Sequence, residues 1–347
     1  MRREREEDRC FGNAIPLEPP TVLFYNCDGM EFDCVVTRMG MTDMAEHDRE
    51  RAGVSSRLTQ TCVCADGGPL WAEGDGSQGI LRCSSCDLLM RQDPQRDDFT
   101  GWYEQHYWQE FFDEQQGLAR SNLWTHIMNR IERLMSGRGL LVDVGCGGGA
   151  LLSHCRDRGW NGIGFELSQA AVRSACAQGL DVRRQGWPPC PLPDATVQAV
   201  TCVNVLDHLS PPCDALQEMW RILRPGGLLY LRVSNAPLHV GLSNITRRLQ
   251  LPDLTVMHRY GFGKRSLHIH LHRLGFRKIT VRTSPPTQAD AYRQGDGFDR
   301  PLRRVCKQTD RFLYRIAKSF GLDRLAWGLS LEATAVKPVG AGARVDG

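Results

Sequence analysis

Apolar stretches alternate with amphipathic stretches along the central part of the chain. Five apolar runs predict buried strands, at 140–144, 161–166, 180–184, 197–203 and 227–234. Three stretches with apolar residues every three or four positions predict helices, at 149–158, 168–177 and 212–222. This alternation, with glycine and proline at the joints, predicts an α/β protein with a doubly wound, mainly parallel sheet.

The pattern predicts further elements on both sides of this core. A helix over 118–135 leads into the first strand, and residues 330–338 have the composition of a terminal strand of the same sheet. Residues 300–320 form the clearest amphipathic helix, with large apolar residues on one face and lysine and arginine on the other. We expect its apolar face to pack against the central domain, and the alternative is peripheral contact with an anionic membrane.

These patterns divide the chain into five parts. Residues 1–60 mix charge runs and prolines without a sustained period, so we interpret them as disordered, or as sequence before a true start at Met41 or Met44. The other parts are a small cysteine-rich module at 61–98, an aromatic helical lid or linker at 99–139, the α/β domain with its basic helical segment at 140–338, and a tail at 339–347.

Composition and charge narrow the class of protein. The chain has 14 cysteines in 347 residues without a recognisable signal peptide, which favours a reducing cytoplasm over a disulfide scaffold. No run of about 18 apolar residues is present, so we expect no transmembrane segment. Residues 241–282 carry nine lysines and arginines against Asp253 alone, which suits an anionic partner, although a solvated basic face is the commoner explanation.

A glycine-rich segment joins the first predicted strand to the first helix. Residues 142–149 read Val-Asp-Val-Gly-Cys-Gly-Gly-Gly. Without Cβ atoms, the backbone at Gly145 and Gly147 can turn tightly and lie against a ligand, and the following helix offers free N–H donors. This pattern alone would also satisfy a loose dinucleotide-binding fingerprint.

Three surrounding features favour S-adenosylmethionine (SAM) over a nicotinamide dinucleotide. Asp143 stands where dinucleotide-binding strands usually carry an apolar residue, and its carboxylate can hold the loop and the ammonium group of the cofactor. Glu166, at the end of the next strand, can accept hydrogen bonds from both ribose hydroxyls. The sheet then continues into Asn204-Val-Leu-Asp-His-Leu and into Leu223-Arg-Pro-Gly-Gly.

In this order and spacing, residues 140–235 resemble the class I SAM-dependent methyltransferases. The resemblance implies a Rossmann-like fold and transfer of a methyl group from SAM. It also implies a cofactor site in four parts: the methionine part of SAM beside Asp143, Gly145, Cys146 and Gly147; the ribose on Glu166 and Leu167; the adenine between Gly186 and Trp187; and a floor of Asn204 and Val205. The family usually has an acidic and a small residue after the third strand, and this chain departs from that, so Trp187 either stacks on adenine or packs on the sheet.

Methyl transfer from SAM is a displacement at carbon that requires mainly alignment and a dry pocket. A general base is needed only for some acceptors, and His208 is the predicted candidate, with His258 a second possibility. The alternative for His208 is to cap a helix or bridge backbone. The motif is shared across acceptors, so the methylated atom stays open. We expect a small molecule, a glycan or a lipid precursor, with nucleic acid not excluded.

Two cysteine pairs define the N-terminal module. Cys62 and Cys64 are separated by 18 residues from Cys83 and Cys86, and four thiolates can bind a structural Zn²⁺. The segment is too short and too rich in glycine to fold on its own core, which favours a metal over four free thiols. The second pair and the following aromatic residues resemble the zinc-ribbon-like leader of some bacterial methyltransferases. Those leaders have two residues between the first cysteines, and this chain has one.

Two other functions remain open. A zinc module would also suit a binding or scaffold protein with a vestigial SAM fold, although the intact Asp143, glycines and Glu166 argue against it. An NAD-dependent oxidoreductase is the third possibility. Protection of the fold by NAD(H) rather than by SAM would identify it.

Overall fold

A computed structural model describes six stretches of the chain: residues 62–64, 67–73, 79–92, 120–250, 258–286 and 299–340, without side chains at 299–307. Three predicted parts lie outside these residues: residues 1–60, the aromatic part of the predicted lid at 99–119, and the last part of the tail. Within them, no helix is long and apolar enough to cross a membrane.

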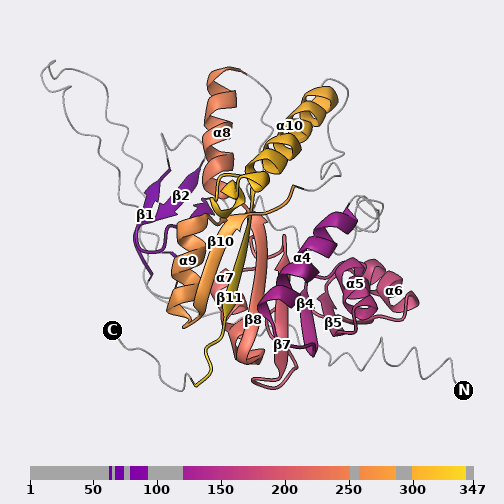
Figure 1. Ribbon diagram of the computed structural model, residues 1–347. Coiled ribbons are helices and arrows are strands. Elements are labelled where there is room, and N and C mark those ends of the chain that lie inside the picture. The colour runs from indigo at the N-terminus through magenta and orange to yellow at the C-terminus, as the bar shows by residue number, and fades with distance from the viewer. Residues whose placement is uncertain are drawn as a thin grey trace, which may run out of the picture.

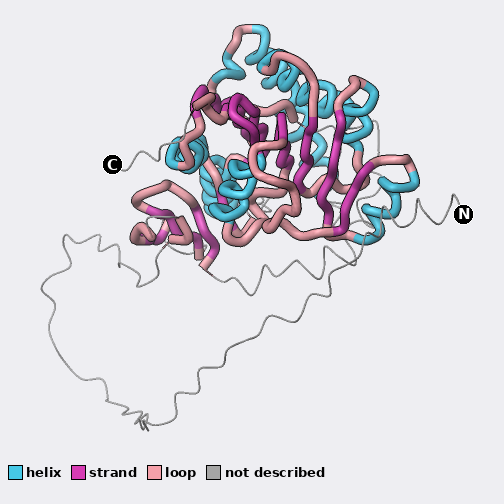
Figure 2. The backbone as a smooth tube through the Cα atoms, turned by 90° about the horizontal axis from the view of Figure 1, so that it is seen from below, coloured by secondary structure: helices cyan, strands magenta, loops and turns pink. Residues whose placement is uncertain are grey.

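Seven strands form the central sheet, in the order β10-β11-β8-β7-β4-β5-β6 (Figures 1 and 2). They are β4 (Leu140–Val144), β5 (Asn161–Glu166), β6 (Asp181–Arg184), β7 (Val197–Val203), β8 (Leu223–Ser234), β10 (Arg277–Thr283) and β11 (Ser330–Val336). Strands β4 to β8 are parallel, and β11 runs antiparallel between β8 and β10. The predicted α/β class and the doubly wound sheet are confirmed.

Helices cover both faces of this sheet. Apolar residues of α4 (Ser121–Leu134), α5 (Ala150–Asp157) and α6 (Gln169–Ala177) share one core with Leu141. Those of α7 (Pro212–Ile222) and α9 (Lys264–Arg273) share the other core with Val142 and Val144. Successive residues of β4 therefore enter opposite cores, as strand geometry requires. Strand β8 begins four residues before the predicted position, because Leu223 already pairs with Val197.

The cysteine-rich module forms a second, four-stranded sheet that includes a strand of the large domain. Strands β1 (Leu70–Ala72), β2 (Ile80–Cys83) and β3 (Leu89–Arg91) are antiparallel neighbours, and β9 (Tyr260–Gly261) pairs with β3. Leu70 and Leu81 are buried in the same core as α7 and α9. The module is therefore packed against the α/β domain rather than tethered to it.

Helices α8 (Ala236–Arg248) and α10 (Asp299–Ser319) both extend past the same end of the sheet (Figure 1), and the short helix η4 (Leu322–Arg324) follows α10. The prediction for α10 is wrong for part of its apolar face. Tyr314 and Ala317 are buried, but large residues expected in the core are exposed: Phe312, Leu313, Ile316 and Phe320. The helix packs through a neighbouring arc of its surface, and membrane contact through 300–320 stays a prediction.

Candidate functional site

The glycine loop leaves the carboxyl end of β4. Gly145, Gly147 and Gly149 have φ angles of 68°, 54° and 78°, in the left-handed region that favours glycine. A Cβ on Gly145 would lie 2.4 Å from Cγ2 of Val205. The N–H groups of Gly145 and Cys146 donate to the carbonyl oxygen of Phe165, at 2.8 and 3.2 Å. The structure thus brings the predicted loop and Val205 together by a close backbone approach.

Asp143 is a buried carboxylate inside β4, with only 4% of its surface exposed. Its Oδ1 accepts a hydrogen bond from Oγ1 of Thr201, on the neighbouring strand, at 2.6 Å. Burial raises the pKa of Asp143 to about 7; the Thr201 hydrogen bond opposes this shift and the charge of Glu166 adds to it. Asp143 therefore titrates near neutrality in the absence of a ligand.

Glu166 ends β5 and faces the glycine loop. Its Oε2 accepts from the backbone N–H of Gly147 at 2.9 Å, and its Oε1 accepts from that of Ser168 at 2.8 Å. Burial raises the pKa of Glu166, and these backbone hydrogen bonds oppose the shift. The carboxylate therefore fixes the loop to the start of α6 while facing the site.

The two carboxylates give the site a negative character. The hydrogen-bond donors found for them among the described residues are one hydroxyl and backbone N–H groups, all of them neutral. A ligand with a positive charge would offset the cost of burying these groups, whereas an anionic one would be repelled. The site thus fits the ammonium and sulfonium of SAM.

Asn204 follows β7 and contacts a residue that the sequence analysis missed. Its Oδ1 accepts a hydrogen bond from Nη1 of Arg232, which is 4% exposed near the end of β8. The other hydrogen-bond partners of Arg232 are the hydroxyl of Ser284 at 2.9 Å and the carbonyl oxygen of Pro285 at 3.3 Å. Burial lowers the pKa of Arg232 to about 10, so it stays charged at neutral pH. One sign of this residue is visible in the sequence, because Arg232 interrupts the apolar run Leu-Leu-Tyr-Leu-Arg-Val.

The predicted adenine contacts lie after β6. Trp187 packs on Phe165 with ring centroids 5.5 Å apart, and its Nε1 donates to the carbonyl oxygen of Ala215 in α7 at 3.1 Å. Gly186 lies beside Leu167, since a Cβ there would be 3.3 Å from its Cδ2. The indole is thus held by the sheet and α7, and contacts of these three residues with a cofactor stay a prediction.

Cys146 and His208 lie on two loops of the same edge. The sulfur of Cys146 packs against Gly164, because a Cβ on residue 164 would lie 2.4 Å from that sulfur. Burial raises the pKa of the Cys146 thiol well above its ordinary value, so it is neutral.

Burial lowers the pKa of His208, and the charge of Asp207 opposes this shift. The imidazole is therefore neutral at neutral pH. Helix α7 starts at Pro212 with Pro211 in the cap position, so His208 is not its cap.

The four cysteines of the N-terminal module converge, as predicted. All four sulfurs lie within 4.8 Å of one another, and all four residues are buried. The sulfurs of Cys62 and Cys86 are 3.6 Å apart, and those of Cys64 and Cys83 are 3.9 Å apart. Four thiolates about 2.3 Å from a tetrahedral Zn²⁺ lie about 3.8 Å from each other. The donor set and its spacing therefore fit zinc.

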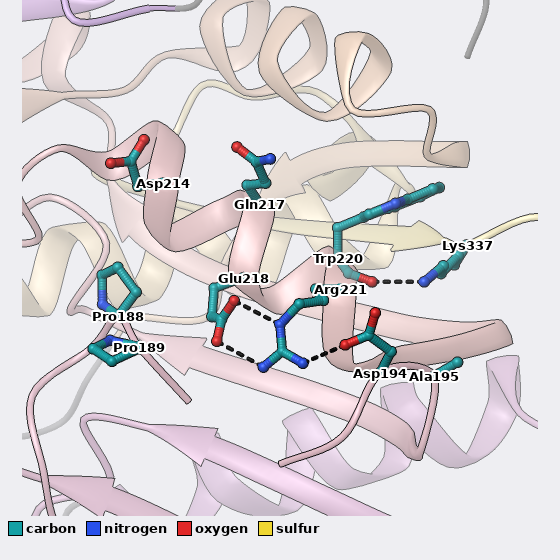
Figure 3. A pocket seen from close by; sticks show the side chains of 10 residues that line it. All are labelled: Pro188, Pro189, Asp194, Ala195, Asp214, Gln217, Glu218, Trp220, Arg221 and Lys337. Atoms are coloured by element: carbon teal, nitrogen blue, oxygen red, sulfur yellow. Dashed lines mark hydrogen bonds and ion pairs between the residues drawn. The ribbon is translucent and has the colours of Figure 1, made fainter. Parts of the chain in front are cut away.

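A hollow of about 560 Å³ lies beside α7, apart from these residues (Figure 3). Several charged groups around it have partners within the protein: Arg221 contacts Glu218 and Asp194, and Nζ of Lys337 donates to the carbonyl oxygen of Trp220 at 2.8 Å. None of the predicted site residues lines it. The hollow is therefore separate from the predicted cofactor site.

Comparison with known proteins finds similar methyltransferases. A family model described as a methyltransferase domain matches residues 118–281. A probable SAM-dependent methyltransferase of Mycolicibacterium smegmatis is 31% identical over 125 residues, which are 34% of this chain and 48% of that protein. A ubiquinone biosynthesis O-methyltransferase of Paracidovorax citrulli is 29% identical over 106 residues, which are 27% of this chain and 43% of that protein.

The chain thus spans about half the length of these curated relatives. Among solved structures, a SAM-dependent methyltransferase of Thermotoga maritima, described as a possible histamine N-methyltransferase, is 18% identical, with a TM-score of 0.44 over 67% of this chain and 99% of that chain. The family match covers the five parallel strands, the glycine loop and the two carboxylates. Over residues 118–281, the chain is therefore similar to the methyltransferase-domain family, as its sequence predicts.

Proposed function

We propose that the chain binds SAM at the carboxyl edge of β4, β5 and β7 and directs its methyl group to a small-molecule, glycan or lipid-precursor acceptor. The observation that supports this most is the pair of buried carboxylates, Asp143 and Glu166, whose described hydrogen-bond donors are neutral. A cationic cofactor resolves the cost of that arrangement.

Each residue of the site then has a physical role. When bound, SAM supplies an electrophilic methyl group on a good leaving group. Asp143 would hold the ammonium group and Glu166 the ribose, while the glycine loop lets the backbone approach the methionine part. Asn204 and Val205 would line the floor beneath the reacting carbon. Fixed positions and exclusion of water are the main contributions expected of these residues.

The alternative nicotinamide cofactor fits this site poorly. A dinucleotide places an anionic pyrophosphate on the glycine loop, against the helix that follows it. Here Glu166 already accepts from the N–H of Gly147, and Asp143 adds a second acid nearby. Electrostatic repulsion therefore favours SAM.

The acceptor is proposed to carry an anionic group. Arg232 is buried beside Asn204, its hydrogen-bond partners among the described residues are neutral oxygens, and the nearby acids Glu332 and Asp207 act on it through charge alone. A carboxylate or phosphate on the acceptor would offset this buried charge and form charge-assisted hydrogen bonds. The acceptor would then bind between the end of β8 and the cofactor.

Thermal unfolding tests the choice of cofactor. We expect S-adenosylhomocysteine at 100 times its Kd to stabilise the fold by about 2.7 kcal/mol, which shifts the midpoint by several degrees. NADH at the same concentration should leave the midpoint unchanged. A shift with NADH alone would favour an oxidoreductase, and no shift with either ligand would favour a scaffold.

We also propose that the cysteine cluster holds one structural Zn²⁺. The short strands of the module have little core of their own, and Gly68 is confined by the module's own side chains, because a Cβ there would lie 2.9 Å from the sulfur of Cys83. Binding of Zn²⁺ by thiolates contributes directly to folding in such modules.

Metal analysis of purified protein tests this proposal. We expect about one zinc per chain, lost in Cys83→Ser together with several degrees of thermal stability. Cys213→Ser, which alters a cysteine outside the cluster, should retain the zinc. Metal-free wild-type protein of full stability, purified without chelator, would contradict the proposal.

A further inference from the structure

A second group of metal-ligand side chains lies beside the proposed cofactor site. Asp207 and His208 follow β7 in the turn that begins with Asn204, and His258 lies two residues before Tyr260 of β9. The two segments are joined because the N–H of Tyr260 donates to the carbonyl oxygen of Asp207 at 3.2 Å. Residues separated by about 50 positions thus meet at the edge of the sheet.

The three side chains bring one ligand atom each into a small region. One carboxylate oxygen and one ring nitrogen from each histidine lie within 4.8 Å of one another. Nε2 of His258 is 3.9 Å from Oδ2 of Asp207, and the two imidazole centroids are 3.8 Å apart. Ligands about 2.1 Å from a shared ion lie roughly 3.0–3.4 Å apart, so the separations, at most 4.8 Å here, would have to shorten by up to about 1.8 Å on binding an ion.

Asp207 provides an independent sign of a missing partner. Its side chain is 5% exposed, and its Oδ1 has no hydrogen-bond partner among the described residues. A buried acceptor without a hydrogen-bond partner destabilises the folded state, and more so when it is charged. At 3.9 Å, the imidazole of His258 is too far from Oδ2 for the direct hydrogen bond that an acid–base pair requires. A cation between these groups would satisfy the carboxylate.

We propose that Asp207, His208 and His258 bind one divalent transition-metal ion. Two imidazoles and one carboxylate are the ligand set of Zn²⁺ and Fe²⁺ sites, whereas Mg²⁺ and Ca²⁺ prefer oxygen ligands. Three protein ligands leave coordination positions open. Asp207 and His208 follow Asn204 in the same turn, so the metal site would adjoin the proposed cofactor site. This placement rests on the proposed function, and the binding of metal does not.

Calorimetric titration of the zinc-replete full-length protein with Co²⁺ tests the proposal. We expect about one further Co²⁺ per chain, with binding at least about tenfold weaker in Asp207→Asn and in His258→Gln. The wild-type protein should keep its zinc throughout this titration, which separates the site from the cysteine cluster. His268→Gln, an exposed histidine of α9, is the matched control and should bind Co²⁺ as the wild type does.

Each result has one reading. Absence of Co²⁺ binding in folded wild-type protein, or equal affinity in the wild type and both variants, would overturn the metal site. Binding of S-adenosylhomocysteine by the same samples separates the two proposals: its presence without Co²⁺ binding overturns the metal site alone, and its absence with Co²⁺ bound overturns the proposed cofactor alone. If one of Asp207→Asn and His258→Gln has a lowered unfolding temperature, the Co²⁺ affinity of the other variant is compared with that of the wild type.

Discussion

Glu166→Gln is expected to weaken S-adenosylhomocysteine binding about 10- to 100-fold. The substitution removes the negative charge that would accept the ribose hydroxyls, and a charged acceptor contributes about 1.5–3 kcal/mol. It also sets an amide NH₂ against one of two backbone donors, the N–H of Gly147 or that of Ser168. Both the lost charge and the opposed N–H groups should therefore lower the affinity for S-adenosylhomocysteine. Calorimetry at pH 8 measures the loss.

The matched control for this variant is Glu132→Gln. Glu132 lies on α4 and pairs with Arg158 at 3.0 Å, so the substitution removes the same charge outside the site. Its affinity for S-adenosylhomocysteine should equal that of the wild type. Wild-type affinity in folded Glu166→Gln would remove Glu166 from the site.

Asp143→Asn is expected to raise the free energy of unfolding at pH 8 and to weaken binding of S-adenosylhomocysteine. The folded-state pKa of about 7 exceeds the ordinary value of 3.8, so the folded state binds more protons than the unfolded state. The free energy of unfolding of the wild type therefore falls as pH rises from about 4 to about 7. Asparagine has no such dependence, and the variant should gain roughly 1–4 kcal/mol over the wild type at pH 8.

Ligand affinity should change in the opposite sense. Ionised Asp143 attracts the ammonium group, so wild-type affinity for S-adenosylhomocysteine should rise as pH increases through about 7. In Asp143→Asn the same profile should be flat across this range and about tenfold below the wild type at pH 8. Thermal unfolding and calorimetry between pH 5 and pH 9, in buffers of equal ionic strength, measure both effects.

Two further variants support the assignment to Asp143. Thr201→Val removes the hydrogen bond that opposes the pKa shift, so the midpoint of the affinity profile should move to higher pH. Asp181→Asn alters an exposed acid at the start of β6 and should leave the profile unchanged. An unshifted profile in Thr201→Val and a pH-dependent one in Asp143→Asn would assign the titration to another group.

The sheet and the cofactor loop could be predicted from the sequence because their signals are local. Buried parallel strands require apolar runs, and the left-handed backbone at Gly145 and Gly147 requires glycine, so both leave a direct trace. The convergence of the four cysteines also follows from the spacing of two pairs. The early start of β8 could not be read, because pairing of Leu223 with Val197 is a contact between distant residues.

Other features depend on how elements are assembled. An amphipathic pattern shows that α10 has an apolar face, but not which arc meets the domain, and the structure buries Tyr314 while it exposes Phe312. The contact of Asn204 with Arg232 joins two strands and was missed. His258 was noted as a single histidine, but its approach to Asp207 depends on the pairing of β9 with the cysteine-rich module.

Calorimetric titration of the purified full-length protein with S-adenosylhomocysteine at pH 8, with NADH in parallel, tests the central claim most directly. We predict one molecule of S-adenosylhomocysteine bound per chain with micromolar affinity, and no heat from NADH. Well-folded protein that binds neither ligand, or NADH alone, would contradict the account of Asp143 and Glu166 as a SAM site.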